Sequence, residues 1–323
     1  MSTISAIYVR LPNWIGDVCM SLPCLDLLLE TKLPIVVCAR PWARDLLSAY
    51  PLAGFIPMSG RWRKDRAAVQ AYRKKARHAH ARGLLLPDSL SSAMVFRFAG
   101  IPCAGHRDDG RSLILRWPLS KSAQPLHAVE AWYRLTYKTL RKWGLSPAHP
   151  TAPECLGLRL TADHVDEAEA LMSDAGIKPG QFVLIAPTAV GLHRGKVKVW
   201  PGFDALTRRL QDQGHMVAMC PPPNEVQQAL DNAPTAFCLP SAGLGAFATL
   251  TRQASLVICN DSGVSHVAAA AGARQLTLFG VTQRERTGPW SPSATCLGSA
   301  TAWPSVDEAE LTAQHLMHTC PVH

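Results

Sequence analysis

The sequence lacks the glycine-rich motifs and the long apolar runs that identify several large classes of protein. Its 323 residues contain neither G-x-G-x-x-G nor a P-loop, which argues against a dehydrogenase and a P-loop kinase. No stretch approaches the ~18–20 apolar residues of a membrane-spanning helix. Met1–Pro12 shows no basic start, apolar run or cleavage site of an export signal. We therefore expect a cytoplasmic protein with at most a peripheral contact to the membrane.

Cysteine is present, but the usual cysteine patterns are missing. The ten cysteines are scattered from Cys19 to Cys320, with no C-x-x-C pair and no Cys/His cluster at zinc spacing. Cys19, Cys38 and Cys259 lie within or beside apolar runs. We expect reduced thiols that pack as small hydrophobic side chains, and no bound metal.

Charged residues make up only 18% of the chain, and the two signs are unevenly placed. The hydrophobic fraction of 47% excludes disorder over most of the chain, and the length predicts two domains. Residues 1–155 carry a net charge of +12 and residues 156–323 a net charge of −3. Nine Lys and Arg and a single acidic residue, Asp65, fall within Arg61–Arg82. This charge permits nucleic acid, an anionic membrane or a phosphorylated substrate as a partner.

Short aliphatic runs alternate with amphipathic segments, and the alternation starts again in the second half. Ile4–Leu11 predicts a first strand, and Phe182–Ala186 predicts the first strand of a second series. Such alternation favours parallel sheets with helices on both faces. We expect an α/β protein with two doubly wound, Rossmann-like domains facing each other across a ligand-binding crevice. The predicted domains are residues 1–155 and 176–304, joined by a boundary region at 156–175 and followed by a helix at 305–319.

The first candidate constellation is the segment NWIGD, which ends at Asp17 and connects the first predicted strand to the first helix. Such a βα loop lies at the ligand-binding edge of a parallel sheet. Gly16 permits close approach of the backbone. Position alone leaves two interpretations of Asp17. It caps the helix and complements the helix dipole, or it is a general base directed into the crevice.

The second constellation is the segment LVICNDSGVSH, a buried strand that ends in a carboxylate and runs into a helix. Backbone N–H groups at Ser262 and Gly263 would form a phosphate site at the helix N-terminus, within reach of His266. Asp261 is suited to the hydroxyls of a ribose or a sugar. The structural alternatives are an N-cap role for Asp261 and a purely helical role for His266.

The third constellation follows the first strand of the second domain, in the segment APTAVGLHRGKVKVWP. It contains four groups able to contact phosphate, unless it is only a solvated basic loop: Thr188, Arg194, Lys196 and Lys198. Glu225 follows the next strand and either binds two ribose hydroxyls or begins a helix. Cations, carboxylates and a helix N-terminus together fit a nucleotide diphosphate. With a lone base on the other domain, the set indicates a two-domain sugar transferase.

Three motifs in this order resemble a known family. W-[IV]-G-D appears as Trp14–Asp17, K-x-W-P as Lys198–Pro201, and D-[ST]-G-x-x-H as Asp261–His266. The chain thereby resembles the ADP-heptose:lipopolysaccharide heptosyltransferases, glycosyltransferase family 9. Leu86–Gly105 looks like the acceptor-domain segment of the second-heptosyltransferase type, so the resemblance covers most of the chain.

The resemblance implies the GT-B arrangement, with the C-terminal helix at 305–319 packing back on the first domain. It also implies an inverting, metal-independent transfer without a cofactor, from ADP-L-glycero-D-manno-heptose to the acidic lipopolysaccharide inner core. Asp17 would remove the proton of the acceptor hydroxyl. The residues that would bind the donor are Thr188, Lys198, Glu225, Asp261, Ser262, Gly263 and His266.

We interpret the basic segment as a patch that steers the acidic acceptor to Asp17 and holds the enzyme at the inner face of the membrane. The expected acceptor-binding residues are Trp14, Arg61, Arg63, Lys64, Arg73, Lys74, Lys75 and Arg77. Nucleic acid is disfavoured, because only two aromatic residues interrupt the segment. Four alternatives stay open: transfer of the first heptose onto Kdo, another nucleotide sugar, a binding module without catalysis, and Lys196 in place of Lys198.

Overall fold

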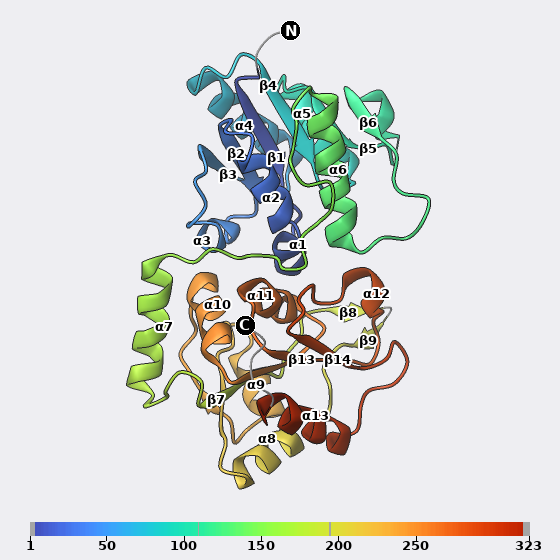
Figure 1. Cartoon of the computed structure of the whole chain (residues 1–323). Coiled ribbons are helices and arrows are strands. Elements are labelled where there is room, and N and C mark those ends of the chain that lie inside the picture. Colours follow the sequence, from blue (N-terminus) through green and yellow to red (C-terminus); the bar gives the residue numbers. More distant parts are fainter. Residues whose placement is uncertain (1–3, 109, 194, 319–323) are drawn as a thin grey trace. The chain divides into compact units, whose positions relative to one another are not determined.

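The computed structural model describes residues 4–108, 110–193 and 195–318. The chain divides into two compact units, Met1–Pro153 and Glu154–His323 (Figure 1). The division falls two residues before the domain end expected at 155, and residues 156–175 belong to the second unit rather than to a separate boundary region. Within the described part of the chain, no helix has both the length and the hydropathy needed to cross a membrane.

The first unit is built on a six-stranded sheet in which every strand pairs in parallel with its neighbours. The first strand of the chain lies inside the sheet, and the chain then winds outwards in both directions. The strands, in spatial order, are β3 (Gly54–Pro57), β2 (Ile35–Ala39), β1 (Ala6–Arg10), β4 (Ala81–Leu85), β5 (Cys103–His106) and β6 (Trp117–Leu119).

Helices cover both faces of this sheet. Val69 and Phe96 share a core with Tyr8 on one face, and α2 (Leu22–Leu29) and α6 (Ala128–Lys142) contact each other on the opposite face (Figure 1). β1 is buried along its whole length, as expected for a strand covered on both sides. The helices are α1 (Ile15–Met20), α2 (Leu22–Leu29), α3 (Ala43–Leu46), α4 (Trp62–Lys75), α5 (Leu90–Phe98), the 3₁₀ helix Arg111–Leu113 and α6 (Ala128–Lys142).

The second unit repeats the same strand order in a second parallel sheet. Its strands, in spatial order, are β11 (Phe237–Cys238), β10 (Met216–Met219), β7 (Phe182–Ala186), β12 (Leu256–Asn260), β13 (Gln275–Phe279) and β14 (Ala294–Gly298). A short hairpin of β8 (Leu192–His193) and β9 (Lys196–Val197) follows β7. The helices are α7 (Ala162–Asp174), α8 (Phe203–Asp212), α9 (Val226–Asn232), α10 (Leu244–Gln253), α11 (Gly263–Ala271), α12 (Arg284–Thr287) and α13 (Val306–His318).

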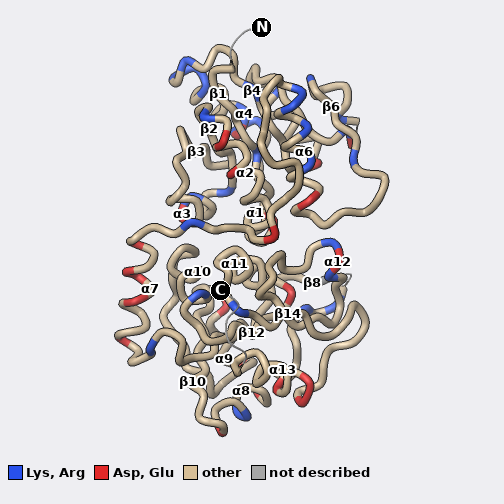
Figure 2. The backbone as a smooth tube through the Cα atoms, viewed as in Figure 1, with Lys and Arg blue, Asp and Glu red and all other residues tan. Residues whose placement is uncertain are grey.

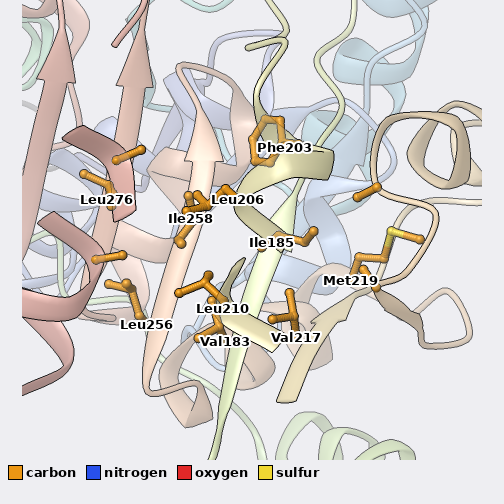
Figure 3. Packing of buried hydrophobic residues seen from close by; sticks show 14 of the residues in the cluster. Val183, Ile185, Phe203, Leu206, Leu210, Val217, Met219, Leu256, Ile258 and Leu276 are labelled. Carbon is orange, nitrogen blue, oxygen red and sulfur yellow. The ribbon is translucent and has the colours of Figure 1, made fainter. Parts of the chain in front are cut away.

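Alternate residues of β7 build two cores. Val183 and Ile185 point towards α8, where Leu206 and Leu210 meet them (Figure 3). Phe182 and Leu184 belong to the core on the opposite face, beneath α7 and α10. Because successive side chains of a strand point to opposite faces, an unbroken apolar run is buried on both sides. The predicted class of two doubly wound α/β domains is confirmed.

The C-terminal helix α13 packs on the second unit through its small residues. Ala309 and Ala313 of this helix are buried in the core of the second unit, against α8. Arg209 on α8 bridges to Asp307 at 2.6 Å and to Glu310 at 2.8 Å. Two buried alanines and the ion pairs with Arg209 therefore hold α13 against α8 of the second unit.

Candidate active site

Asp17 lies at the carboxyl edge of the first sheet, in the first turn of α1. The buried Arg10 at the end of β1 holds the loop before it: the guanidinium donates to Asn13 Oδ1 at 2.6 Å and to the Cys38 carbonyl at 3.3 Å. Trp14 occupies the N-cap position without a side-chain cap and is 73% exposed. Asp17 is thus not the N-cap, but it is the acidic residue in the first turn of α1, where it still complements the helix dipole.

The environment of Asp17 suits a general base. Burial raises the pKa of its carboxyl from 3.8 to about 6. In the described residues, no side chain donates a hydrogen bond to this carboxylate that would offset the lost hydration. A carboxylate with a pKa near the working pH is deprotonated in the cell and still basic enough to accept a proton.

The basic segment Arg61–Arg82 is divided between two edges of the sheet. α4 runs from the carboxyl end of β3 to the amino end of β4, so about 20 Å of helix separates its ends. Near the C-terminal end of the basic segment, the backbone N–H of His80 donates to Ser5 Oγ at 3.1 Å, just before β1 begins. This end of the segment therefore lies at the amino edge of the sheet. The first basic group comprises Arg61, Arg63 and Lys64, and the second basic group comprises Arg73, Lys74, Lys75 and Arg77.

Only the first basic group lies at the edge that carries Asp17. The second basic group lies at the amino edge, so the expectation that it contacts the acceptor beside Asp17 is not supported. Arg82 does not extend the patch, because it stacks on Trp117 and Trp143 at 5.2 and 5.7 Å. Figure 2 shows how Lys and Arg gather on the first unit, whereas Asp and Glu mark α7 and α13 of the second.

A polar cluster at the same carboxyl edge of the first sheet as Asp17 escaped the sequence analysis. Asp88, just after β4, accepts from Lys121 Nζ at 2.7 Å and from the fully buried Arg111 at 3.2 Å, and its Oδ1 lies 3.3 Å from His106 Nδ1. Burial alone would raise the pKa of Asp88, but the hydrogen bonds from His106 and Lys121 outweigh it and hold that pKa at about 2. The available signal was position, since Asp88 follows β4 and His106 ends β5.

In the second unit, the structure brings Thr188 and Glu225 together. Thr188 follows β7 and Glu225 follows the neighbouring strand β10, and the Thr188 hydroxyl donates to Glu225 Oε2 at 2.5 Å. Glu225 is half-buried at the start of α9 and makes no side-chain cap there. Its orientation is set by Thr188, which leaves its remaining lone pairs to accept from the hydroxyls of a ligand.

The start of α11 has the features of an anion site. Ser262 is the N-cap, and its Oγ accepts from Val264 N at 3.3 Å. Asp261 is therefore not the cap of this helix. His266 lies on the first turn of α11 and is 7% exposed. Unpaired N–H groups and the helix dipole favour a negative charge at such a position.

The two competing lysines differ in how firmly the chain holds them. Lys196 is exposed in the hairpin strand β9, whereas Lys198 is half-buried and two residues before Trp200. Trp200 is fixed at both ends: its backbone N–H donates to Asn260 Oδ1 at 2.8 Å and its indole N–H donates to the Pro304 carbonyl at 2.9 Å. Arg194 lies outside the described residues. Of the two lysines, Lys198 is therefore the more buried and lies closer to an anchored residue.

Comparison with known proteins decides the family. The sequence model described as glycosyltransferase family 9 (heptosyltransferase) matches residues 69–317, about three quarters of the chain. The chain belongs to glycosyltransferase family 9. It is 29% identical over 337 residues to lipopolysaccharide heptosyltransferase 2 of Escherichia coli K12, covering 96% of this chain and 93% of that protein. It is 28% identical to lipooligosaccharide heptosyltransferase 2 of Haemophilus influenzae, over 88% of this chain and 86% of the relative.

Solved structures agree with this assignment. The family 9 chain is similar to the ADP-heptose lipopolysaccharide heptosyltransferase II of E. coli, with a TM-score of 0.75 and 25% identity, over 97% of this chain and 98% of the other. It also shares its fold with E. coli heptosyltransferase WaaC solved with ADP, with a TM-score of 0.73, 20% identity, and coverage of 96% and 99%. The expected GT-B fold and glycosyltransferase activity are therefore confirmed.

Proposed function

We propose that this chain transfers the second heptose of the lipopolysaccharide inner core, from ADP-L-glycero-D-manno-heptose to the first heptose. The observation that carries the proposal is the similarity to lipopolysaccharide heptosyltransferase 2, which extends over 96% of the chain. It is joined by a carboxylate poised as a base, Asp17, and by a set of phosphate- and ribose-binding groups on the second unit. The acceptor is acidic, which agrees with the net +12 charge of residues 1–155.

The proposed reaction is a single displacement. Asp17 accepts the proton of the acceptor hydroxyl, and that oxygen attacks the anomeric carbon of the heptose. The bond from this carbon to the diphosphate oxygen breaks and ADP leaves, so the configuration at the anomeric carbon inverts. Lys198, the N-terminus of α11 and His266 stabilise the negative charge that grows on the diphosphate. No metal or cofactor takes part in this proposal.

Substrate binding divides between the two units in the proposal. Glu225, held by Thr188, binds the ribose hydroxyls, and Asp261 binds hydroxyls of the donor sugar. Trp14 offers an exposed ring for stacking on a sugar of the acceptor, next to Asp17. The first basic group attracts the carboxylates and phosphates of the inner core.

We assign the second basic group a different role, contact with the inner face of the cytoplasmic membrane. Its edge of the sheet carries further exposed cations, among them Arg116 before β6 and Arg141 and Lys142 at the end of α6. Each Lys or Arg near an anionic bilayer contributes about 1 kcal/mol of attraction. In this proposal membrane contact is a role of the amino edge, and acceptor binding is a role of the first basic group at the edge with Asp17.

The test compares two acceptors under identical conditions. The protein is incubated with ADP-heptose and lipopolysaccharide that ends either at Kdo or at the first heptose, and the products are read by mass spectrometry. Addition only to the acceptor that carries the first heptose supports the proposal. Addition only to Kdo reassigns the chain to the first transfer. If the wild type and the Asp17→Asn variant both bind ADP-heptose and neither extends either acceptor, the chain is a binding module.

A further inference from the structure

A fully buried amide lies where the donor-binding loops meet. Asn260 is the last residue of β12 and has an exposed fraction of 0%. The four residues before it, Leu256–Cys259, are apolar. A polar amide in such a place costs free energy unless its hydrogen-bonding groups are paired. The buried amide of Asn260 therefore needs hydrogen-bond partners nearby.

Asn260 pairs with two separate loops at once. Its Oδ1 accepts from the backbone N–H of Trp200 at 2.8 Å. Its Nδ2 donates to the carbonyls of Ala186 and Thr188, each at 3.3 Å. The orientation of the amide follows from these partners, because a backbone N–H only donates and a carbonyl only accepts. One side chain thus joins the end of β12, the loop after β7 and the segment before α8.

Each of the joined segments carries a donor-binding candidate. Thr188 is itself bonded, Lys198 lies two residues before Trp200, and Asp261 and Ser262 follow Asn260 directly. We infer that Asn260 is a positioning residue, which holds Thr188 and Lys198 in register with the N-terminus of α11. The inference rests on the proposed function, since it deepens the account of the same donor site.

Neither aspartate nor leucine would make the same three bonds. Aspartate would keep the acceptor for Trp200 but would turn a carboxylate oxygen towards the two carbonyls. Leucine fills the space and bonds to none of the three groups. The neighbouring anchor, Asn232, donates only to the Pro187 carbonyl at 2.7 Å, so it holds one loop and links it to α9 instead. Asn260 alone joins the Thr188 loop to the Lys198 segment among these contacts.

The experiment replaces Asn260 with aspartate and uses a buried amide of the same unit as a matched control. Gln275, on the neighbouring strand β13, is also 0% exposed, but it lies at the amino end of its strand and away from the loops. Asn260→Asp and Gln275→Glu both place a carboxylate in the core of the second unit. ADP affinity by calorimetry and thermal stability are measured for both in the full chain.

We expect Asn260→Asp to weaken ADP binding about 10- to 100-fold, because the loss of one charge-assisted hydrogen bond to the diphosphate costs about this much in affinity. Gln275→Glu should lower stability and leave the ADP affinity of the folded protein within about twofold. In a Lys198→Ala background, Asn260→Asp should weaken ADP binding several-fold less than it does in the wild type, since only one of the two groups that it positions, Thr188, remains. Asn260→Ser, which is too short to span both loops, should weaken ADP binding in the same way if the aspartate variant does not fold.

Two results would overturn the inference. Unchanged ADP affinity in Asn260→Asp or Asn260→Ser would show that the bonds do not position the site. An equal loss in Gln275→Glu would show a general effect of core damage. Failure of the proposed function is distinct, because the wild-type chain would then transfer no heptose whatever the variants do.

Discussion

Replacing Asp17 with asparagine tests both the chemistry and the energetics of the proposed base. Asparagine keeps the size of the side chain and cannot accept the hydroxyl proton. Turnover should fall by roughly 10²–10⁴, while ADP affinity stays near the wild-type value, because a general base acts in the transition state. The matched control is Glu30→Gln, which neutralises an exposed carboxylate at the end of α2 and should leave turnover unchanged.

The raised pKa of Asp17 fixes the shape of the pH profile. With a pKa of about 6, kcat/KM of the wild type should rise with unit slope up to pH 6 and then level off. At pH 5 the rate should be about a tenth of the plateau, since only about that fraction is deprotonated. The asparagine variant should lose this limb and show a flat residual rate over the same range.

The same shift predicts a change in stability with a definite sign. A pKa raised from 3.8 to about 6 by burial means that the charged form is disfavoured in the folded state. This penalty is absent below about pH 4, grows as the pH rises to 6, and reaches about 2–3 kcal/mol above it. Asp17→Asn should therefore raise the free energy of unfolding at pH 8 and leave it unchanged at pH 4, as measured with urea.

Two results would refute the role of Asp17 as the base. One is wild-type turnover in the Asp17→Asn variant, and the other is a kcat/KM that still rises with pH up to pH 6 in that variant.

Three further predictions follow from the site. Lys198→Ala should weaken ADP binding about 10- to 100-fold by calorimetry, and Lys196→Ala less than twofold, because only Lys198 is held beside the anchored tryptophan; the reverse order would move the phosphate role to the hairpin. Charge reversal of the first basic group should raise the acceptor KM at least tenfold with an unchanged donor KM. Charge reversal of the second basic group should instead reduce the amount of protein that sediments with anionic vesicles. Equal effects of the two reversals on the acceptor KM would contradict the proposal that only the first basic group binds the acceptor. Asp88→Asn should lower the free energy of unfolding at pH 7. Because the pKa of Asp88 is held at about 2, the difference in the free energy of unfolding between wild type and variant should become smaller as the pH falls below 4. A difference that does not change with pH would contradict the stabilising role of the charge on Asp88.

Local pattern in the sequence was enough to predict the two sheets and the loops that carry the donor-site candidates. The apolar runs that became β1, β7 and β12 are buried on both faces, so each gave an unbroken hydrophobic signal. The carboxyl ends of parallel strands share one edge, and this rule correctly brought the residues after β7 and β10 together, as the bond from Thr188 to Glu225 shows.

Tertiary packing explains what the sequence did not predict. α13 presents a stripe of small residues that fits any helix of suitable shape, so its sequence did not indicate that α8 would be the partner. Asn260 was passed over because a single polar residue at a strand end has no periodicity, and its hydrogen-bond partners lie in two loops far away in the chain.

The division of the basic segment, in contrast, could have been predicted. A helix between two parallel strands must run from one edge of the sheet to the other, so the separation of Arg61 from Arg77 followed from the fold class already predicted.

The most direct test of the whole account is a product measurement with the lipopolysaccharide that ends at the first heptose. The wild-type chain and ADP-heptose should add one heptose to this acceptor, with one ADP released for each heptose added and with inverted configuration at the new anomeric centre by NMR. The Asp17→Asn variant should bind the same donor and form almost none of this product. ADP release without a heptosylated product, or transfer with retained configuration, would contradict the account.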